Sequence, residues 1–172
     1  TFVINEHLVT GEDVSFTPSP NTSGLFEKGC PDTIVIHFTA GSSLTSSVNV
    51  LTNPDSGVSA HFAVGRSGNI VQMLPTNKIA WHAGESYFEG RSGLNQYSIG
   101  IELDNAGQLK ERSDGTYESW FGKVFEKSEV FEAKKKNQHA TGYWHKYSDI
   151  QISRTLTLCK KLCEHYQIST IV

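Results

Sequence analysis

Two polar side chains interrupt apolar, strand-like stretches, and their types suit hydrolysis at a metal centre. His37 follows the apolar run of "TIVIHFTAGSS", and Glu102 follows that of "YSIGIELDN". Burying a carboxylate in such a stretch is costly unless it is paired, lies near a metal or faces a wet cleft. A histidine that binds zinc and a carboxylate that handles the proton of a zinc-bound water are the minimum of a zinc hydrolase. The pair therefore predicts a hydrolytic site.

Two further histidines leave other interpretations open. A single histidine in a strand is commonly a core residue that is hydrogen-bonded to a neighbour. His61 and His82 lie in the same part of the chain, so with His37 they would offer three imidazoles to a metal. A three-histidine site thus stands beside the pairing of His37 with Glu102.

The alternation of side chains along a strand places His37 and Glu102 on the faces opposite the isoleucines of their strands. In a strand at 33–39, His37 points away from the isoleucines, because successive side chains of a strand face opposite ways. In a strand at 97–103, Glu102 likewise lies opposite the isoleucines, and Gly100 beside it permits close approach of another group. We expect the two strands to present a common polar face.

The other elements complete an α/β pattern. A short helix is expected to end at Asn53-Pro54, and "RSGN" at 66–69 predicts a hairpin turn. Ser148 and Gln151 form a capping box that begins a long helix. We expect this helix to bury one stripe, made of Ile152, Leu156, Cys159, Cys163 and Tyr166. The fold class is therefore a single α/β domain, a mixed β-sheet with flanking helices.

The segment 104–147 is polar, and no helix or strand is assigned to it. Its lysine-rich part, "EAKKKNQHATG", is typical of a solvated loop rather than a binding patch.

Composition narrows the class of function. The 172 residues suit one domain, and 15 basic against 18 acidic residues give a net charge of -3. No basic field is available for a phosphate backbone, so we expect no nucleic-acid partner. No apolar run approaches the length of a membrane span, and the three cysteines follow neither a disulfide nor a metal-binding pattern. We expect a monomer.

Four motifs in sequence resemble the type-2 N-acetylmuramoyl-L-alanine amidases. This family includes phage lysozyme amidases, bacterial amidases and animal peptidoglycan recognition proteins. The motifs are "TIVIHFTAG", "VSAHFAVGRSGNIVQMLP", "AWHAGES" and "LNQYSIGIELDN". On this resemblance we expect residues 31–172 to be an amidase-like domain and residues 1–30 to be an N-terminal arm outside it.

The resemblance implies a zinc enzyme that hydrolyses the amide between N-acetylmuramic acid and L-alanine in peptidoglycan or muropeptides. His37 matches a zinc ligand of the family, and Glu102 matches its catalytic carboxylate. Trp81 and His82 match the wall of the substrate groove.

Three more positions follow from the same resemblance. Asn95 belongs with the substrate-binding residues and, together with Ser98, matches positions that brace the glutamate strand. His61 matches a recurrent histidine that we interpret as structural. The resemblance therefore argues against the three-histidine site.

The sequence departs from the family pattern after its long helix. There the family carries a motif like G-H-x-D-I-x-P-x-R-K-x-D-P-G, with the second zinc histidine, the third ligand and a lysine, whereas this sequence ends at "HYQISTIV". "HKYSDI" at 145–150 is similar but precedes the helix. We expect a fragment of a longer protein, with the remaining ligands beyond residue 172. The alternative is a divergent member without the metal, acting as a non-catalytic peptidoglycan-binding module.

The N-terminal arm favours the cell envelope, periplasmic or secreted, as the location. Polymeric wall and released anhydro-muropeptide both remain open as substrates.

Overall fold

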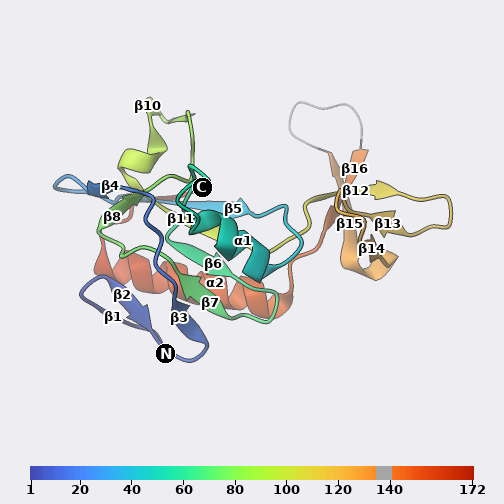
Figure 1. Cartoon of the computed structure of the whole chain (residues 1–172), viewed down its shortest axis with the longest axis horizontal. Coiled ribbons are helices and arrows are strands. Elements are labelled where there is room, and N and C mark those ends of the chain that lie inside the picture. Colours follow the sequence, from blue (N-terminus) through green and yellow to red (C-terminus); the bar gives the residue numbers. More distant parts are fainter. Residues whose placement is uncertain (135–140) are drawn as a thin grey trace.

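A mixed β-sheet with a helix on each face forms the centre of the computed structural model, which describes residues 1–134 and 141–172 (Figure 1). In the described residues the sheet has six strands in the order β17-β5-β11-β6-β7-β3. The first four run parallel, β7 is antiparallel to β6, and β3 is parallel to β7. The strands are β3 (Val14–Phe16), β5 (Thr33–Phe38), β6 (Phe62–Val64), β7 (Ile70–Gln72), β11 (Ser98–Leu103) and β17 (Thr170–Ile171). The predicted α/β class is confirmed.

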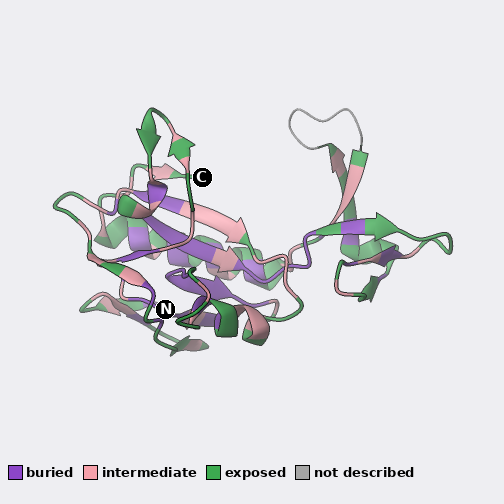
Figure 2. Ribbon diagram, turned by 45° about the horizontal axis from the view of Figure 1, so that its top comes forward, coloured by how far each residue is buried: buried purple, intermediate pink, exposed green. Residues whose placement is uncertain are grey.

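The two faces of this sheet are covered unequally. Helix α2 (Asp149–His165) covers one face, where the larger core gathers the apolar residues of β5, β6 and β11 around Leu158 and Leu162. Helix α1 (Leu44–Leu51) covers part of the other face through Val48 and Leu51. Figure 2 shows burial concentrated in this sheet and on the inner sides of the helices. The α1 face is therefore the one with room for a site.

The predicted helix and hairpin before β11 are confirmed. The hydroxyl of Ser43 accepts the backbone N–H of Ser46, which caps the start of α1, and the helix ends at Thr52, just before Asn53-Pro54. Strands β6 and β7 pair across the turn at 65–69. Helix α1 packs on this hairpin, where Val48 and Leu51 meet Ala63 of β6.

Helix α2 begins where predicted but buries a different stripe. Ser148 and Gln151 form the expected capping box. The side-chain amide of Gln151 also donates to the carbonyls of Val64 and Asp104, at 3.0 and 2.8 Å, which turns this position toward the sheet. The buried positions follow from it at helical spacing: Gln151, Thr155, Leu158, Cys159 and Leu162.

The prediction of burial is therefore wrong for three residues of the stripe. Ile152 and Leu156 are 43% and 58% exposed, and Cys163 is exposed as well. Cys159 is buried as predicted, and Tyr166 packs against the core. The spacing of apolar residues did not predict the buried face of α2, because the polar residue Gln151 determines which face meets the sheet.

The polar segment 104–147 contains strands that the sequence did not predict. This segment forms a second, antiparallel sheet with the order β14-β13-β12-β16-β15 in the described residues, which we call the insert sheet; it projects to one side of the main sheet (Figure 1). Its strands are β12 (Gln108–Glu111), β13 (Tyr117–Glu118), β14 (Val124–Phe125), β15 (Val130–Lys134) and β16 (Thr141–His145), with the 3-10 turn η2 (Lys127–Glu129). A small core of Leu109, Tyr117 and Phe125 holds it together. Part of the lysine-rich loop, 135–140, lies outside the described residues.

The N-terminal residues form three short pairings with themselves or with the rest of the domain. Strands β1 (Val3–Asn5) and β2 (Leu8–Thr10) form a hairpin, β3 is an edge strand of the main sheet, and β4 (Thr22–Leu25) pairs with β8 (Lys78–Ala80). The domain boundary at residue 30 stays a prediction. The excursion before β11 holds β9 (Tyr87–Phe88), β10 (Arg91–Ser92) and the 3-10 turn η1 (Leu94–Gln96). Within the described ranges, no helix has the length and apolar character needed to cross a membrane.

The α2 stripe predicts a difference between two leucines on one helix. Leu158→Ala should lower the free energy of unfolding by about 2–5 kcal/mol, because Leu158 is fully buried. Leu156→Ala, the matched control, should change it by only about 0.5 kcal/mol, because that side chain is exposed. Urea unfolding of both variants measures this. Equal losses would contradict the observed face.

Candidate active site

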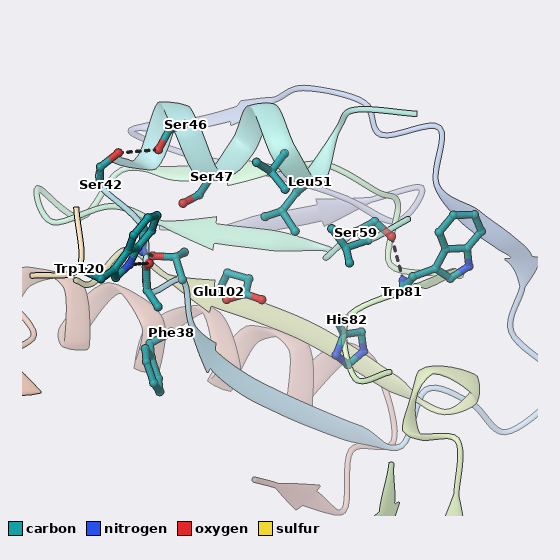
Figure 3. Close-up of a pocket in the computed structure, with 15 residues that line it drawn as sticks. Phe38, Ser42, Ser46, Ser47, Leu51, Ser59, Trp81, His82, Glu102 and Trp120 are labelled. Atoms are coloured by element: carbon teal, nitrogen blue, oxygen red, sulfur yellow. Dashed lines mark hydrogen bonds between the residues drawn. The ribbon is translucent and has the colours of Figure 1, made fainter. Parts of the chain in front are cut away.

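A cavity of about 490 Å³ opens on the α1 face of the main sheet. Its walls come from the loop between β5 and α1, from α1 itself, from the segments at 58–59 and 81–82, and from the insert sheet. Figure 3 shows Glu102 near its middle, with Trp120 toward one end and Trp81 toward the other. Three of the predicted site residues, Trp81, His82 and Glu102, thus line one cavity.

The parallel pairing of β5 and β11 sets the centre of the site. In this register Glu102 is the direct partner of His37. Paired residues of neighbouring strands point to the same face, so the two side chains lie side by side on the α1 face. The pair predicted from the sequence is therefore brought together by one strand pairing.

Glu102 sits in a setting that favours its protonated form. Burial raises the pKa of its carboxyl to about 7. Within residues 1–134 and 141–172, no ion pair reaches this carboxylate. A pKa near neutrality lets the group both accept and return a proton during a reaction.

His82 is the acceptor of a hydrogen bond from His37. Nε2 of His82 lies 3.1 and 3.3 Å from the hydroxyl and carbonyl oxygens of Ser98. The Ser98 hydroxyl donates to the carbonyl of Leu94, so both oxygens accept and Nε2 of His82 carries the proton. Nδ1 of His82 then accepts from Nε2 of His37 at 2.9 Å. This leaves Nδ1 of His37 with its lone pair.

The His82 ring is neutral and held in place from two sides. Burial lowers its pKa to about 3. The backbone N–H groups of His82 and Ala83 both donate to Oδ1 of Asn95, at 3.1 and 2.8 Å. Gly100 gives the ring its room, because a Cβ at that position would lie 2.4 Å from Cγ of His82. Glycine at 100 is thus a requirement of the site.

Asn95 and Ser98 act from behind the cavity wall. Asn95 fixes the backbone of the 82–83 loop, and Ser98 orients the His82 ring. Neither residue belongs to the cavity lining. Both residues thus hold His82 and its loop; their expected bracing of the glutamate strand and the substrate contact of Asn95 stay predictions.

Trp81 is half-buried, and hydrogen bonds hold it at the cavity edge. Its indole N–H donates to Ser23 at 2.7 Å, and its backbone N–H donates to Ser59 at 2.8 Å. Because Ser59 is itself buried and bonded to Asn21, the position of Trp81 is fixed by the N-terminal segment.

His61 is a structural residue in this geometry. Its Nε2 donates to the carbonyl of Lys78 at 2.6 Å, and its Nδ1 accepts the backbone N–H of Gly100 at 3.0 Å. The ring is fully buried, and burial lowers its pKa to about 4. Both nitrogens of His61 are therefore committed, and the three-histidine zinc site is not formed.

The described residues do not form a zinc site by themselves. Zinc sites in enzymes use three protein ligands. Across the described ranges, no group of three or more His, Cys, Asp or Glu side chains is arranged to hold a metal ion. His37 offers one nitrogen, so these residues alone do not fit a bound zinc.

One lining residue escaped the sequence analysis. Trp120 comes from the insert sheet, and its indole N–H donates to the carbonyl of Ala40 at 2.6 Å. The available signal was a tryptophan in a polar segment, "TYESWFGK", where a core position is improbable. A polar segment with no predicted helix or strand gave no reason to place Trp120 at the cavity.

The model of one protein family matches residues 27–172, and its description is N-acetylmuramoyl-L-alanine amidase. A stretch of 52 residues is 52% identical to 1,6-anhydro-N-acetylmuramyl-L-alanine amidase AmpD of Escherichia coli, covering 30% of this chain and 28% of that protein. A stretch of 84 residues is 42% identical to N-acetylmuramoyl-L-alanine amidase AmiD of Escherichia coli, covering 45% and 29%. The matched stretches thus span less than a third of these curated relatives.

Solved structures share the fold over nearly the whole chain. A crystal structure of an AmpD derivative superposes with a TM-score of 0.63 at 22% identity, covering 98% of this chain and 84% of the other. AmiD from Escherichia coli, in complex with anhydro-N-acetylmuramic acid-L-Ala-D-gamma-Glu-L-Lys, gives a TM-score of 0.58 at 25% identity, covering 98% and 53%. The likeness to the AmpD derivative concerns the fold alone.

Burial of Glu102 predicts a dependence of stability on pH. The folded-state pKa of about 7 lies above the ordinary value of 4.5, so the folded state holds this proton more tightly. The stabilisation is complete below pH 4.5 and is lost as the pH rises through 7. Glu102→Gln removes this titration. The free energy of unfolding of the variant minus that of the parent should therefore increase between pH 5 and pH 8, by up to about 3 kcal/mol.

Urea unfolding of the metal-free protein at several pH values tests this. Glu85→Gln, a change at an exposed carboxyl, is the control and should show no such trend. A constant difference between Glu102→Gln and the parent across this range would mean that the carboxyl is not buried as described.

Proposed function

Because the chain belongs to the N-acetylmuramoyl-L-alanine amidase family, we propose that it hydrolyses the amide bond between N-acetylmuramic acid and L-alanine in peptidoglycan or muropeptides. The observation that carries the proposal is Glu102, a carboxyl whose pKa is near 7, beside His37 in an open cavity. This is the group that acid–base catalysis at neutral pH requires.

The reaction assigns Glu102 two proton transfers. The carboxylate accepts a proton from the attacking water as the oxygen of that water bonds to the lactyl carbonyl carbon. It then gives the proton to the nitrogen of L-alanine as the C–N bond breaks. A carboxylic acid and a free amine result, and Glu102 is returned as a carboxylate. Trp81 and His82, in the cavity lining, bind the substrate in this proposal.

The proposal includes a zinc ion, with His37 among its ligands. Members of this family are typically zinc-dependent, and we assign His37 as one ligand through Nδ1, the nitrogen that its bond to His82 leaves with a lone pair. The remaining ligands would lie beyond residue 172. Glu102 has the same part in proton transfer whichever residues these are.

The substrate class is supported by a neighbour. The similar AmiD structure was solved with an anhydromuramoyl peptide bound, and we extend that class of molecule to this cavity. A location in the cell envelope and a monomeric state remain predictions. The rival function, peptidoglycan binding without catalysis, would need the cavity but not the carboxyl of Glu102.

Substitution of Glu102 separates these two functions. In the longest form of the protein that its gene encodes, Glu102→Gln should slow release of the stem peptide by about 10²–10⁴-fold, since an amide does not take up the proton. Binding of a muramoyl peptide should change little. Chromatography of the free peptide gives the rate, and calorimetry gives the affinity. Hydrolysis at the parent rate would remove Glu102 from the mechanism; binding without hydrolysis in the parent would favour the rival function.

Zinc binding tests the assignment of His37. The 172 residues alone should bind zinc weakly, because a site needs three ligands. In the longest encoded form, His37→Ala should weaken zinc by more than the roughly 10–100-fold typical of losing a residue that only supports a ligand. His61→Gln is the matched control and should keep the metal. Equilibrium dialysis measures both. Tight zinc binding that survives His37→Ala would contradict the ligand role.

A further inference from the structure

We propose that Trp120 forms the sugar subsite of the cavity, while the end at Trp81 takes the stem peptide. The inference rests on the proposed function and adds the direction in which a muramoyl peptide lies. It assigns the insert sheet a part in substrate binding, because that sheet carries Trp120.

Trp120 combines high exposure with a fixed position. Its side chain is 75% exposed, although its N–H donates to the carbonyl of Ala40 at 2.6 Å. Phe121 packs edge-on against it, with ring centres 5.4 Å apart. The one polar atom of the indole is thus satisfied by the protein, and the apolar ring remains open at the cavity. A large exposed aromatic side chain in this state is suited to stacking on a ligand.

The loop that receives this bond is tied to the insert sheet elsewhere. Ala40 has a positive φ of 48°, which is uncommon for a residue other than glycine. The neighbouring N–H of Gly41 donates to the carbonyl of Asn105 at 3.2 Å, and Thr39 donates to the same carbonyl. Asn105 lies between β11 and the insert sheet. The cavity loop and Trp120 are therefore held as one unit.

The end of the cavity at Trp120 has the chemistry of a sugar site. Ser42 and Ser46, at the start of α1, lie toward the same end of the cavity as Trp120, with their hydroxyls 3.2 Å apart (Figure 3). A pyranose ring presents flat C–H faces and a rim of hydroxyls, so it needs an apolar plane together with hydrogen-bonding groups. An indole beside a pair of exposed hydroxyls supplies both.

The opposite end offers few free hydrogen-bonding groups. Ser59 and His82 lie toward Trp81 in Figure 3, and Val58 precedes Ser59 in the cavity wall. The hydroxyl of Ser59 is bonded to Asn21, and both ring nitrogens of His82 are bonded within the protein. An alanine methyl group suits such a wall better than a ring of hydroxyls does. Glu102 lies between the two ends, so a substrate in this direction places the bond between its sugar and its peptide above the carboxyl.

Two half-substrates test the direction. The probes are the peptide-free disaccharide of N-acetylglucosamine and N-acetylmuramic acid, and the sugar-free tripeptide L-Ala-D-gamma-Glu-L-Lys. Trp120→Ala should weaken binding of the disaccharide by about two- to tenfold, the range for loss of an aromatic stacking contact, and leave the tripeptide unaffected. Trp81→Ala should show the reverse pattern. Titration followed by NMR suits the weak affinities expected of fragments.

Two further variants keep the result interpretable. Trp120→Phe retains a flat ring but loses the N–H that bonds Ala40, and it should keep most of the disaccharide affinity. If Trp120→Ala acted only by releasing the loop, Trp120→Phe would lose that affinity as well. Tyr87→Ala removes an aromatic ring of the same 75% exposure away from the cavity and should alter neither probe. If the parent binds both probes and Trp120→Ala changes neither, or weakens the tripeptide instead, the subsite is wrong and the proposed function stands. If the parent binds neither probe, both proposals fail.

Discussion

The parallel pairing of β5 with β11 is the constraint on which the site depends. It aligns Glu102 with His37, and a shift of one residue would turn either side chain to the face covered by α2. The register is secured by burial on that other face, where Ile34, Ile99 and Ile101 are fully buried. The position of the proposed catalytic pair is thus determined by apolar residues that have no part in the proposed chemistry.

A polar network on the α1 face then fixes the hydrogen-bonding roles of the histidine rings. The chain of contacts from Ser98 through His82 to His37 sets which nitrogen of each ring carries a proton. It functions only because Gly100 lets the ring of His82 lie directly on β11. His61 also supports this strand, because its Nδ1 accepts the backbone N–H of Gly100. One strand position without a side chain therefore accommodates two imidazoles with different tasks.

The sequence allowed the central sheet and the pair at its middle to be predicted, because strand alternation is a local signal. His37 and Glu102 stand out as polar residues in apolar runs, and the capping box of α2 is equally local. The buried stripe of α2 was missed because the hydrogen bonds of Gln151 to the sheet, rather than apolar spacing, decide it. The insert sheet was missed because its strands are short and carry charged residues outward, so they lack a clear apolar alternation.

Several features of the cavity oppose stability, and they occur together. Glu102 is a buried carboxyl, Ala40 has a left-handed backbone, and His82 is an imidazole whose charged form burial disfavours. Unfavourable local states of this kind persist only where the surrounding structure determines them, and they cluster at functional sites. The surrounding structure here is the core between α2 and the main sheet, together with the insert sheet that bonds to the loop of Ala40. The insert sheet therefore has a structural task at the cavity as well as the proposed one in binding: it holds in place a loop conformation that the loop itself does not favour.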